Sequence, residues 1–531
     1  MKLLNKQVIH IAIVFFIAFI ARLIYIQQLS HTYFFTPFKG GFDDYVFDQW
    51  AQEILKGNWL GDKAIYIYRM PLYTYILSFV YFLFGHSYWA VYIIQSLVGS
   101  LACILVYLIG RIYFNEAVGF VAGIITALYS PLLFYNGMLV GETFGIFITC
   151  LAFLFLVLFQ KTQKAYHLFI GSLFTGVSIL IRGNVVLMLP FIILWIFIFF
   201  RNKGIVKLLY YVFVFMTGII ISTAPIMIRN YVCEKDVVPI AASGGLNIYI
   251  GNAYGADGKF RLVENVGINL EEMLKKSVEI AEEFAGRKLK PSEVSNYWVE
   301  KTIKSIKDNG TVYIIPLFWK KFVMFWNSYE LPDIWDYYFF KNYIPILKLP
   351  LFGFLVLAPF FAAGVYLSWE KRRELSLLYI FILGYMFSLV AFFITSRYRI
   401  QVVPFLSILS AYAIVQIKDV VRENRKKAII YMIILTGAFI FSNLGIEKVS
   451  FETSHNSLGI LLKRNGKIEE AIKEYNKAIE IAPSYPTPYY NLGILYRDTG
   501  QNNLAVSYFK KALEADPNFT AAKNELERMH I

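Results

Sequence analysis

Charged residues are scarce in this sequence. Asp, Glu, Lys and Arg make up 17% of its 531 residues, whereas a soluble globular protein carries about 25%. Apolar residues account for 57% of the chain and aromatic residues for 18%. So few polar side chains cannot cover a soluble surface of this size. The composition therefore excludes an ordinary soluble protein.

Cysteines are also few. Cys103, Cys150 and Cys233 show neither the spacing of a disulfide framework nor that of metal ligands. Two of them lie in apolar blocks, where a thiol usually acts as a small buried apolar group. A cleavable signal peptide is not expected, because the first apolar block runs past the usual length to Arg22 without a small-residue cleavage site.

Long apolar blocks dominate the sequence instead. A helix needs about 20 mostly apolar residues to span the hydrocarbon of a bilayer. The sequence predicts an all-α polytopic membrane protein with about eleven transmembrane helices. Their expected positions are near 7–26, 88–110, 117–135, 142–160, 166–181, 184–200, 206–226, 350–369, 375–395, 402–417 and 428–444.

The basic residues indicate an orientation rather than a nucleic-acid partner. The net charge is +14, but the Lys and Arg residues lie in short loops between the apolar blocks. Those loops fall on one side if the blocks alternate, and Lys and Arg mark the cytoplasmic side. We therefore expect a cytoplasmic N-terminus and, after eleven crossings of the cell membrane, an extracytoplasmic C-terminus. The basic segments are MKLLNK, QKTQK, RNKGIVK, EKRRE and KDVVRENRKK.

Two long external segments are expected, at about 27–87 and 229–348. The second contains two stretches, 268–286 and 291–310, whose apolar spacing and terminal glycines predict helices. Residues 313–345 are rich in Trp and Tyr, which favour the membrane interface, so this part is expected to lie along the outer leaflet.

The chain after residue 446 carries an internal repeat with a period of 34 residues. The spacing resembles the tetratricopeptide signature and predicts a domain over 446–531, with two repeats and a closing helix. Two repeats are fewer than the usual three, so the membrane body or a partner is expected to complete the stack. The domain could recruit a protein acceptor, dock a protein partner or serve as a packing element. The matching pairs are Leu458 and Leu492, Gly459 and Gly493, Ala471 and Ala505, Tyr475 and Phe509, Ala478 and Ala512, and Pro483 and Pro517.

The first external segment is acidic. Asp43, Asp44, Asp48 and Glu53 fall within 11 residues. A helix is predicted from Asp44 onward, lying on the membrane surface with Asp43 and Asp44 at its N-terminus. One Asp would suffice to cap that helix, so capping alone does not account for the pair at 43 and 44. The expected apolar face of the helix comprises Val46, Phe47, Trp50, Ala51, Ile54 and Leu55.

Further ionisable residues recur at the outer ends of the predicted spans. Such residues are costly at membrane depth and suggest function, although an Arg can also extend to the lipid headgroups. Guanidinium groups match phosphate geometry, and carboxylates beside them suit a phosphate leaving group and a nucleophile that needs a base. The residues are Arg69, Glu142, Arg182, Arg229, Arg397 and Arg399.

Six motifs occur in order over residues 7–445. They are DDYVFDQWA, RMPLYTYILSFVYFLFG, Gly141–Glu142, LIRGNVVLMLP, PIMIRNY followed by GGLNIYIGN, and SRYRIQVVPFLSILSAY. In this order they resemble the membrane glycosyltransferases of family 39, which include the protein O-mannosyltransferases and the lipid A aminoarabinose transferases and share the GT-C fold.

This resemblance implies an inverting glycosyltransferase that uses a polyprenyl-phosphate sugar on the extracytoplasmic membrane face. It implies that Asp43, eight residues before Ala51, is the general base, with Asp44 and Glu142 as further catalytic candidates. Glu142 could bind the acceptor or a divalent cation; no cofactor is otherwise implied. The acceptor, whether protein, lipid or glycan, stays open. The candidates for the donor phosphate are Arg397 and Arg399, followed by Arg69, Arg229 and Arg182.

Three other functions are compatible with a polytopic membrane protein. An oligosaccharide ligase or polymerase is the nearest alternative. A transporter is less favoured, because transporters tend to show matching halves and charges at the midplane, whereas the charges here cluster at outer ends. A membrane-anchored scaffold for the repeat domain would leave the acidic segment unexplained.

Overall fold

The computed structural model shows an all-helical protein, as predicted. Within the described residues the elements are helices, apart from one isolated bridge between Tyr129 and Phe352. The structure describes residues 2–37, 43–61, 67–260, 270–333, 335–349, 351–423, 425–445 and 450–529.

Each of the eleven apolar blocks contains a helix of the membrane body. These helices are α1 (Lys2–Ser30), α4 (Tyr88–Tyr113), α5 (Glu116–Ala127), α7 (Glu142–Thr162), α8 (Ala165–Ile181), α9 (Leu189–Phe200), α10 (Ile205–Glu234), α16 (Phe354–Ser368), α17 (Ser376–Ala391), α19 (Val403–Glu423) and α20 (Arg425–Ser442). Among the described residues, six helical stretches are long and apolar enough to cross a membrane. The number of actual crossings stays a prediction.

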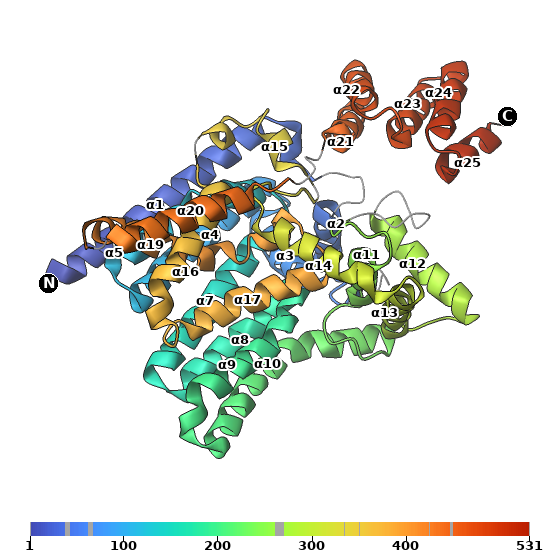
Figure 1. Ribbon diagram of the computed structural model, residues 1–531. Helices are drawn as coiled ribbons and strands as arrows, with labels where there is room; N and C mark the ends of the chain where they lie inside the picture. The colour runs from blue at the N-terminus through green and yellow to red at the C-terminus, as the bar shows by residue number, and fades with distance from the viewer. Residues whose placement is uncertain are drawn as a thin grey trace.

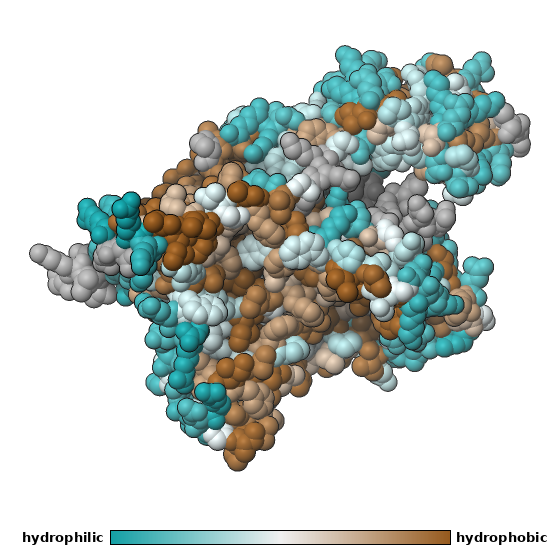
Figure 2. All heavy atoms as spheres, in the orientation of Figure 1, coloured by the Kyte–Doolittle hydropathy of each residue, from teal (hydrophilic) through white to brown (hydrophobic). Residues whose placement is uncertain are grey.

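The surface of the body is divided into zones (Figure 2). An apolar band covers the helical bundle, with hydrophilic residues near the N-terminus on one side and the hydrophilic C-terminal helices on the other. In Figure 1 the two chain ends lie at opposite ends of the molecule. This zoning suits a bilayer around the middle of the bundle.

Shorter helices connect the long helices of the body, and several of them lie between the body and the C-terminal repeat helices. They are η1 (Tyr33–Phe35), α2 (Asp43–Leu55), α3 (Leu72–Phe84), α6 (Ser130–Asn136), η3 (Gly183–Met188), η4 (Arg201–Lys203), α11 (Gly244–Asn252), α12 (Leu270–Ala285), α13 (Pro291–Asp308), η5 (Thr311–Tyr313), α14 (Ile314–Trp326), α15 (Tyr337–Phe340), η6 (Pro345–Lys348), η7 (Trp369–Lys371) and α18 (Ser396–Arg399). The two charged helices predicted in the second external segment are confirmed as α12 and α13. Glycines follow both, at positive φ values of 65° for Gly286 and 78° for Gly310.

Two expectations for the external segments need correction. The apolar face of α2 packs against α3 and the protein core rather than being left for a membrane surface, and Leu55 lies outside that face with 41% of its surface exposed. The aromatic segment is also divided. Trp319 is exposed, but Phe325 and Phe340 are buried in the core. Packing between segments that are distant in the sequence therefore buries many of the side chains that the sequence pattern alone placed at the membrane interface.

The C-terminal repeat forms helical pairs, as predicted. The helices are α21 (Glu452–Arg464), α22 (Ile468–Ile481), α23 (Pro486–Asp498), α24 (Asn502–Ala515) and α25 (Thr520–Arg528). A Cβ atom on Gly459 would lie 2.6 Å from the Tyr475 ring, and Gly493 faces Phe509 in the same way. The small residue and the aromatic of each repeat therefore fit together, which explains their recurrence at a period of 34.

The first repeat is seated on the membrane body (Figure 1). The Phe339 ring of α15 lies 5.7 Å from Phe451 and 5.0 Å from His455, both edge to face. The Lys467 ammonium lies 4.9 Å from the centre of the Tyr33 ring. Aromatic and cation–π contacts of this kind add attraction beyond buried area. They fix the repeat domain against η1 and α15.

Close backbone approach makes Gly364 a sensitive point of the bundle. A Cβ atom there would overlap the backbone of Leu409 in α19. We predict that Gly364→Ala forces α16 and α19 apart and destabilises the protein by about 1–3 kcal/mol. Gly437→Ala in α20 is the matched control, because a Cβ atom there meets no described atom within 4 Å. Unfolding of the detergent-solubilised variants measures both, and equal stability of the two would contradict this packing.

Candidate active site

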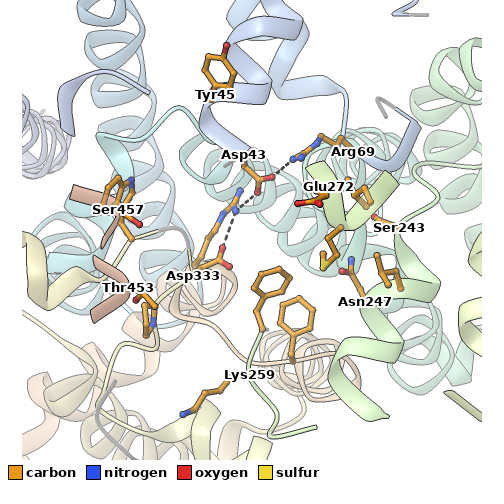
Figure 3. Close-up of a pocket in the computed structure, with 18 of the residues that line it drawn as sticks. Asp43, Tyr45, Arg69, Ser243, Asn247, Lys259, Glu272, Asp333, Thr453 and Ser457 are labelled. Carbon is orange, nitrogen blue, oxygen red and sulfur yellow. Dashed lines mark hydrogen bonds and ion pairs between the residues drawn. The ribbon is translucent and has the colours of Figure 1, made fainter. Parts of the chain in front are cut away.

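A large cavity lies between the membrane body and the repeat domain. Its volume is about 1740 Å³. Residues of α2, α11, α12 and α18 line it from the body, and residues of α21, α23 and α25 line it from the repeat domain. Figure 3 shows Asp43 between these two groups of residues.

Asp43 lies at the first position of α2. A carboxylate at this position complements the positive end of the helix. It forms ion pairs with Arg69 and with Arg397, and its Oδ2 atom lies 2.6 Å from Nη1 of Arg397. Its side chain is 18% exposed, so the carboxylate is held by two cations yet still borders the cavity (Figure 3).

Arg397 joins three carboxylates from distant parts of the chain. In addition to Asp43, its Nη1 atom lies 3.0 Å from Oδ2 of Asp333, and its Nε atom pairs with Glu142. Arg397 belongs to the short helix α18, which Thr395 caps by accepting a hydrogen bond from the backbone of Tyr398. This cap fixes the start of the turn that presents the guanidinium.

Glu142 is the first residue of α7 and is fully buried. It pairs with both Arg182 and Arg397. The Arg182 guanidinium also lies 4.7 Å from the centre of the Tyr398 ring. Breaking such a buried pair would leave an uncompensated charge, so the pairs hold α7, α8 and α18 in register.

The described residues of this cluster balance in charge. Three carboxylates, from Asp43, Glu142 and Asp333, face three guanidiniums, from Arg69, Arg182 and Arg397. Interactions between such charges strengthen where water is excluded. An added anion would therefore compete with the carboxylates for the guanidiniums.

The pKa values of the two Asp residues move in opposite directions. Burial alone would raise the pKa of Asp43, but Arg397 and Arg69 more than offset it, so this pKa lies below its ordinary value. Burial raises the pKa of Asp333 above its ordinary value, although Arg397 opposes the rise. Asp43 is thus the carboxylate more firmly held in its ionised form.

Asp333 was not predicted as a site residue from the sequence. It lies within the aromatic segment around residues 329–340, where the composition drew attention to the membrane interface. An acidic residue inside an apolar, aromatic stretch is costly unless it is paired. The position of Asp333 in such a stretch was the one signal in the sequence that could have identified it. Only the fold shows that its partner is Arg397.

Two arginines predicted to bind phosphate lie elsewhere. Within the described part of the chain, neither Arg399 nor Arg229 lines the cavity. Arg399 is buried, pairs with Glu330 at 2.7 Å and donates to backbone carbonyls that include Phe325 at 3.0 Å. Arg229 donates to the carbonyls of Leu60 and Gly61. Both act as ties between segments.

Asp44 also lies outside the lining of the cavity, as far as the structure describes it. Its side chain is buried, and its Oδ1 atom accepts a hydrogen bond of 2.8 Å from the backbone of Tyr45. Successive helical residues point in different directions, about 100° apart. Asp43 and Asp44 therefore face different neighbours.

A cation site was left open by the sequence. No group of three or more His, Cys, Asp or Glu side chains that could hold a metal ion is found among the residues described. The guanidinium of Arg397 lies among the three carboxylates of the cluster.

The fold and the site together define a helical membrane protein with a charged cavity at its hydrophilic end. Residues 68–228 match the family described as dolichyl-phosphate-mannose-protein mannosyltransferase. Residues 459–500 and 486–519 match descriptions of the tetratricopeptide repeat. These matches confirm the resemblance drawn from the motifs. A search of curated proteins found no match.

Two solved structures are similar to this chain. The oligosaccharyltransferase of Archaeoglobus fulgidus matches with a TM-score of 0.48 and 14% identity, over 90% of this chain and 60% of that one. ArnT from Cupriavidus metallidurans bound to undecaprenyl phosphate matches with a TM-score of 0.45 and 11% identity, over 91% of this chain and 80% of that one. The chain thus spans less than two thirds of the archaeal protein.

The buried pair of Arg399 and Glu330 predicts a stability effect. Arg399→Met leaves the Glu330 carboxylate uncompensated and is expected to cost about 3–5 kcal/mol. The double change Arg399→Met with Glu330→Met should recover part of the loss. Arg372→Met, at an exposed position, is the matched control.

Thermal unfolding in detergent measures all three variants. If Arg399→Met instead unfolds like the wild type but no longer binds polyprenyl phosphate, Arg399 is a ligand of the donor phosphate and not a structural residue.

Proposed function

We propose that this protein transfers a sugar from a polyprenyl-phosphate donor to an acceptor on the extracytoplasmic face of the membrane. The observation that carries the proposal is the cluster of Asp43, Arg69 and Arg397 at the edge of a large cavity. The family match over residues 68–228 supports the donor class, since that family is described by a dolichyl-phosphate sugar.

Arg69 is the foremost candidate for holding the donor phosphate. Its Nη1 atom engages Asp43, but its Nε and Nη2 atoms have no hydrogen-bond partner among the described residues. These two groups form one edge of the guanidinium fork, which matches two oxygens of a phosphate. A buried donor without a partner is costly, so a bound phosphate would relieve that cost.

Asp43 is suited to act as the general base once the donor is bound. Its two arginine partners keep it ionised, which also makes it a weak base. A phosphate that draws Arg69 and Arg397 toward itself would release the Asp43 carboxylate and raise its basicity. The carboxylate would then be the group available to the acceptor at the cavity edge.

The proposed reaction is a single displacement that inverts the anomeric carbon. Asp43 takes the proton of the acceptor hydroxyl, and the acceptor oxygen forms a bond to the anomeric carbon. The bond from that carbon to the phosphate oxygen breaks, and its electron pair leaves with the polyprenyl phosphate. Arg69 and Arg397 stabilise the negative charge that grows on this leaving group.

Glu142 and Asp333 are proposed to position Arg397. Each binds the guanidinium from a different element, α7 and the segment before α15. Arg182, which lines the cavity beside Glu142, is kept as a second phosphate ligand. Arg229 and Arg399 are not proposed as phosphate ligands, because their guanidiniums are bound to Glu330 and to backbone carbonyls.

The orientation completes the proposal. The basic loops predicted to be cytoplasmic connect α7 to α8, α9 to α10, α16 to α17 and α19 to α20. The cavity instead lies at the end of the bundle that carries the repeat domain (Figures 1 and 2). The active site and the repeat domain would thus share the extracytoplasmic side.

Asp43→Asn tests the general base. The amide keeps the shape of the side chain but lacks its basicity, so sugar transfer should fall by about 10²–10⁴-fold. Asp44→Asn is the matched control, and its activity should stay within a few-fold of the wild type. Near-normal turnover of Asp43→Asn, with loss in Asp44→Asn, would move the base to Asp44.

Arg69→Lys tests the phosphate ligand. Lysine keeps the charge but not the fork, so binding of polyprenyl phosphate to the detergent-solubilised protein should weaken by about tenfold or more, roughly 1.4 kcal/mol. Lys276→Arg, at a half-buried position of the cavity wall that pairs with Glu272, should leave this binding within a few-fold of the wild type. Unchanged affinity of Arg69→Lys would show that its unpartnered edge is not the phosphate site.

A further inference from the structure

A lysine of α14 is buried where α11, α14 and α17 meet (Figure 1). Lys321 is 0% exposed. Its ammonium donates three hydrogen bonds, of 2.7 Å to the side-chain oxygen of Asn252, 3.2 Å to the carbonyl of Val390 and 2.6 Å to the carbonyl of Phe392. All three acceptors are uncharged oxygens, although a fully buried lysine is normally paired with a carboxylate. The ammonium therefore serves the backbone around it rather than an ion pair.

The end of α17 needs donors from outside the helix. The last carbonyls of any helix lack an intrahelical partner. If α17 continued, the N–H group of Ile394 would donate to the carbonyl of Val390, four residues earlier. Ile394 donates instead to the carbonyl of Gly258, at 2.9 Å. Lys321 supplies the donor that Val390 would otherwise lack.

The end of α11 is pressed against the same carbonyls. Asn252 is the last residue of α11, and its amide donates a 2.9 Å hydrogen bond to the carbonyl of Ala391. A Cβ atom on Gly251 would lie 2.0 Å from the carbonyl oxygen of Phe392, so no side chain fits there. Two helix C-termini thus meet, and each carries partial negative charge. The Lys321 ammonium offsets that charge.

The chain runs from this junction directly into the candidate active site. We call residues 392–394 the junction segment, of which Phe392 and Phe393 line the cavity. Thr395 then caps α18, and this short helix carries Arg397. Only a few residues separate the end of α17 from Arg397, so the place where α17 ends determines where the guanidinium lies.

The proton of Lys321 completes the arrangement. An ammonium has three N–H groups, one for each of the three oxygens, whereas a neutral amine has only two. Burial opposes the charge and lowers the pKa of Lys321 to about 7. At pH 6 the side chain therefore keeps its third N–H group, and each of the three oxygens has its donor.

We propose that Lys321 is a positioning residue, which fixes the end of α17 and the junction segment and, through them, holds the Arg397 guanidinium in place at the cavity. The proposal rests on the proposed function, in which Arg397 stabilises the phosphate that leaves. An apolar side chain in place of Lys321 would leave two buried carbonyls of α17 without a donor, which is costly. The junction segment would then shift, and a displacement of about 1 Å at a binding group can cost up to about a hundredfold in function.

Hydrogen–deuterium exchange of the detergent-solubilised protein at pH 6 tests the junction. Lys321→Met keeps an unbranched side chain but removes all three donors. The amides of Ile394 and Ser396, which donate to other segments, should exchange at least about tenfold faster in this variant. The amides of α24 in the repeat domain should be unchanged. Lys320→Met is the matched control, because Lys320 is the neighbouring residue of α14 and is exposed.

Binding of undecaprenyl phosphate at pH 6 tests the link to Arg397. Affinity should fall by about tenfold or more in Lys321→Met and stay within about twofold of the wild type in Lys320→Met. In an Arg397→Lys background, Lys321→Met should cause less than about a twofold further loss, because the guanidinium through which Lys321 acts is already absent. A residue that only stabilised the fold would lower the melting temperature without this dependence on Arg397.

Thermal unfolding shows whether Lys321→Met is folded. If it is not, Asn252→Leu, which removes the donor to Ala391, takes its place in both experiments with the same expected results. Unchanged exchange of the junction amides would overturn the proposal. Equal losses of affinity in the wild-type and Arg397→Lys backgrounds would overturn it as well.

The two measurements also separate this proposal from the proposed function. If Lys321→Met speeds exchange at the junction but the wild type does not bind undecaprenyl phosphate, the proposed function is rejected and Lys321 still fixes the junction. If the wild type binds undecaprenyl phosphate and Lys321→Met binds it equally well, the proposed function stands and the positioning role of Lys321 is rejected.

Discussion

The guanidinium of Arg397 is the point on which the site depends. It binds Asp43 of α2, Glu142 of α7 and Asp333 of the segment before α15. A charge so deeply buried is tolerated only when it is paired and hydrogen-bonded. Removing it would leave three carboxylates without their common cation, and the elements that carry them would lose their relative positions.

A second arginine, two residues further on, serves another purpose. Residues at i and i+2 of a helix do not share a face, so Arg397 and Arg399 of α18 point to different neighbours. Arg399 ties α18 to Glu330 and to two carbonyls at the end of α14, those of Phe325 and Asn327. That tie fixes the segment that presents Asp333 to Arg397. The short helix thus supports the ion-pair cluster around Arg397 from two directions.

Contacts between segments that are distant in the sequence also hold the repeat domain in place. Its internal packing is local, through Gly459 with Tyr475 and Gly493 with Phe509. Its placement over the cavity depends instead on contacts with α15 and η1. Because the domain is seated in this way, residues of α21, α23 and α25 line the same cavity as Asp43 and Arg397.

The sequence by itself determined the features that depend on neighbours in the chain. Apolar blocks specified the helices of the body, and a period of 34 specified the repeats. The amphipathic stretch placed Asp43 and Asp44 at the N-terminus of a helix. Only the tertiary structure decided which arginines meet Asp43, that Asp333 joins them, and that the repeat domain closes the cavity. Asp43 and Arg397 are 354 positions apart. Periodicity reports the face of one helix, whereas a pairing at that separation is set by how all the intervening helices pack.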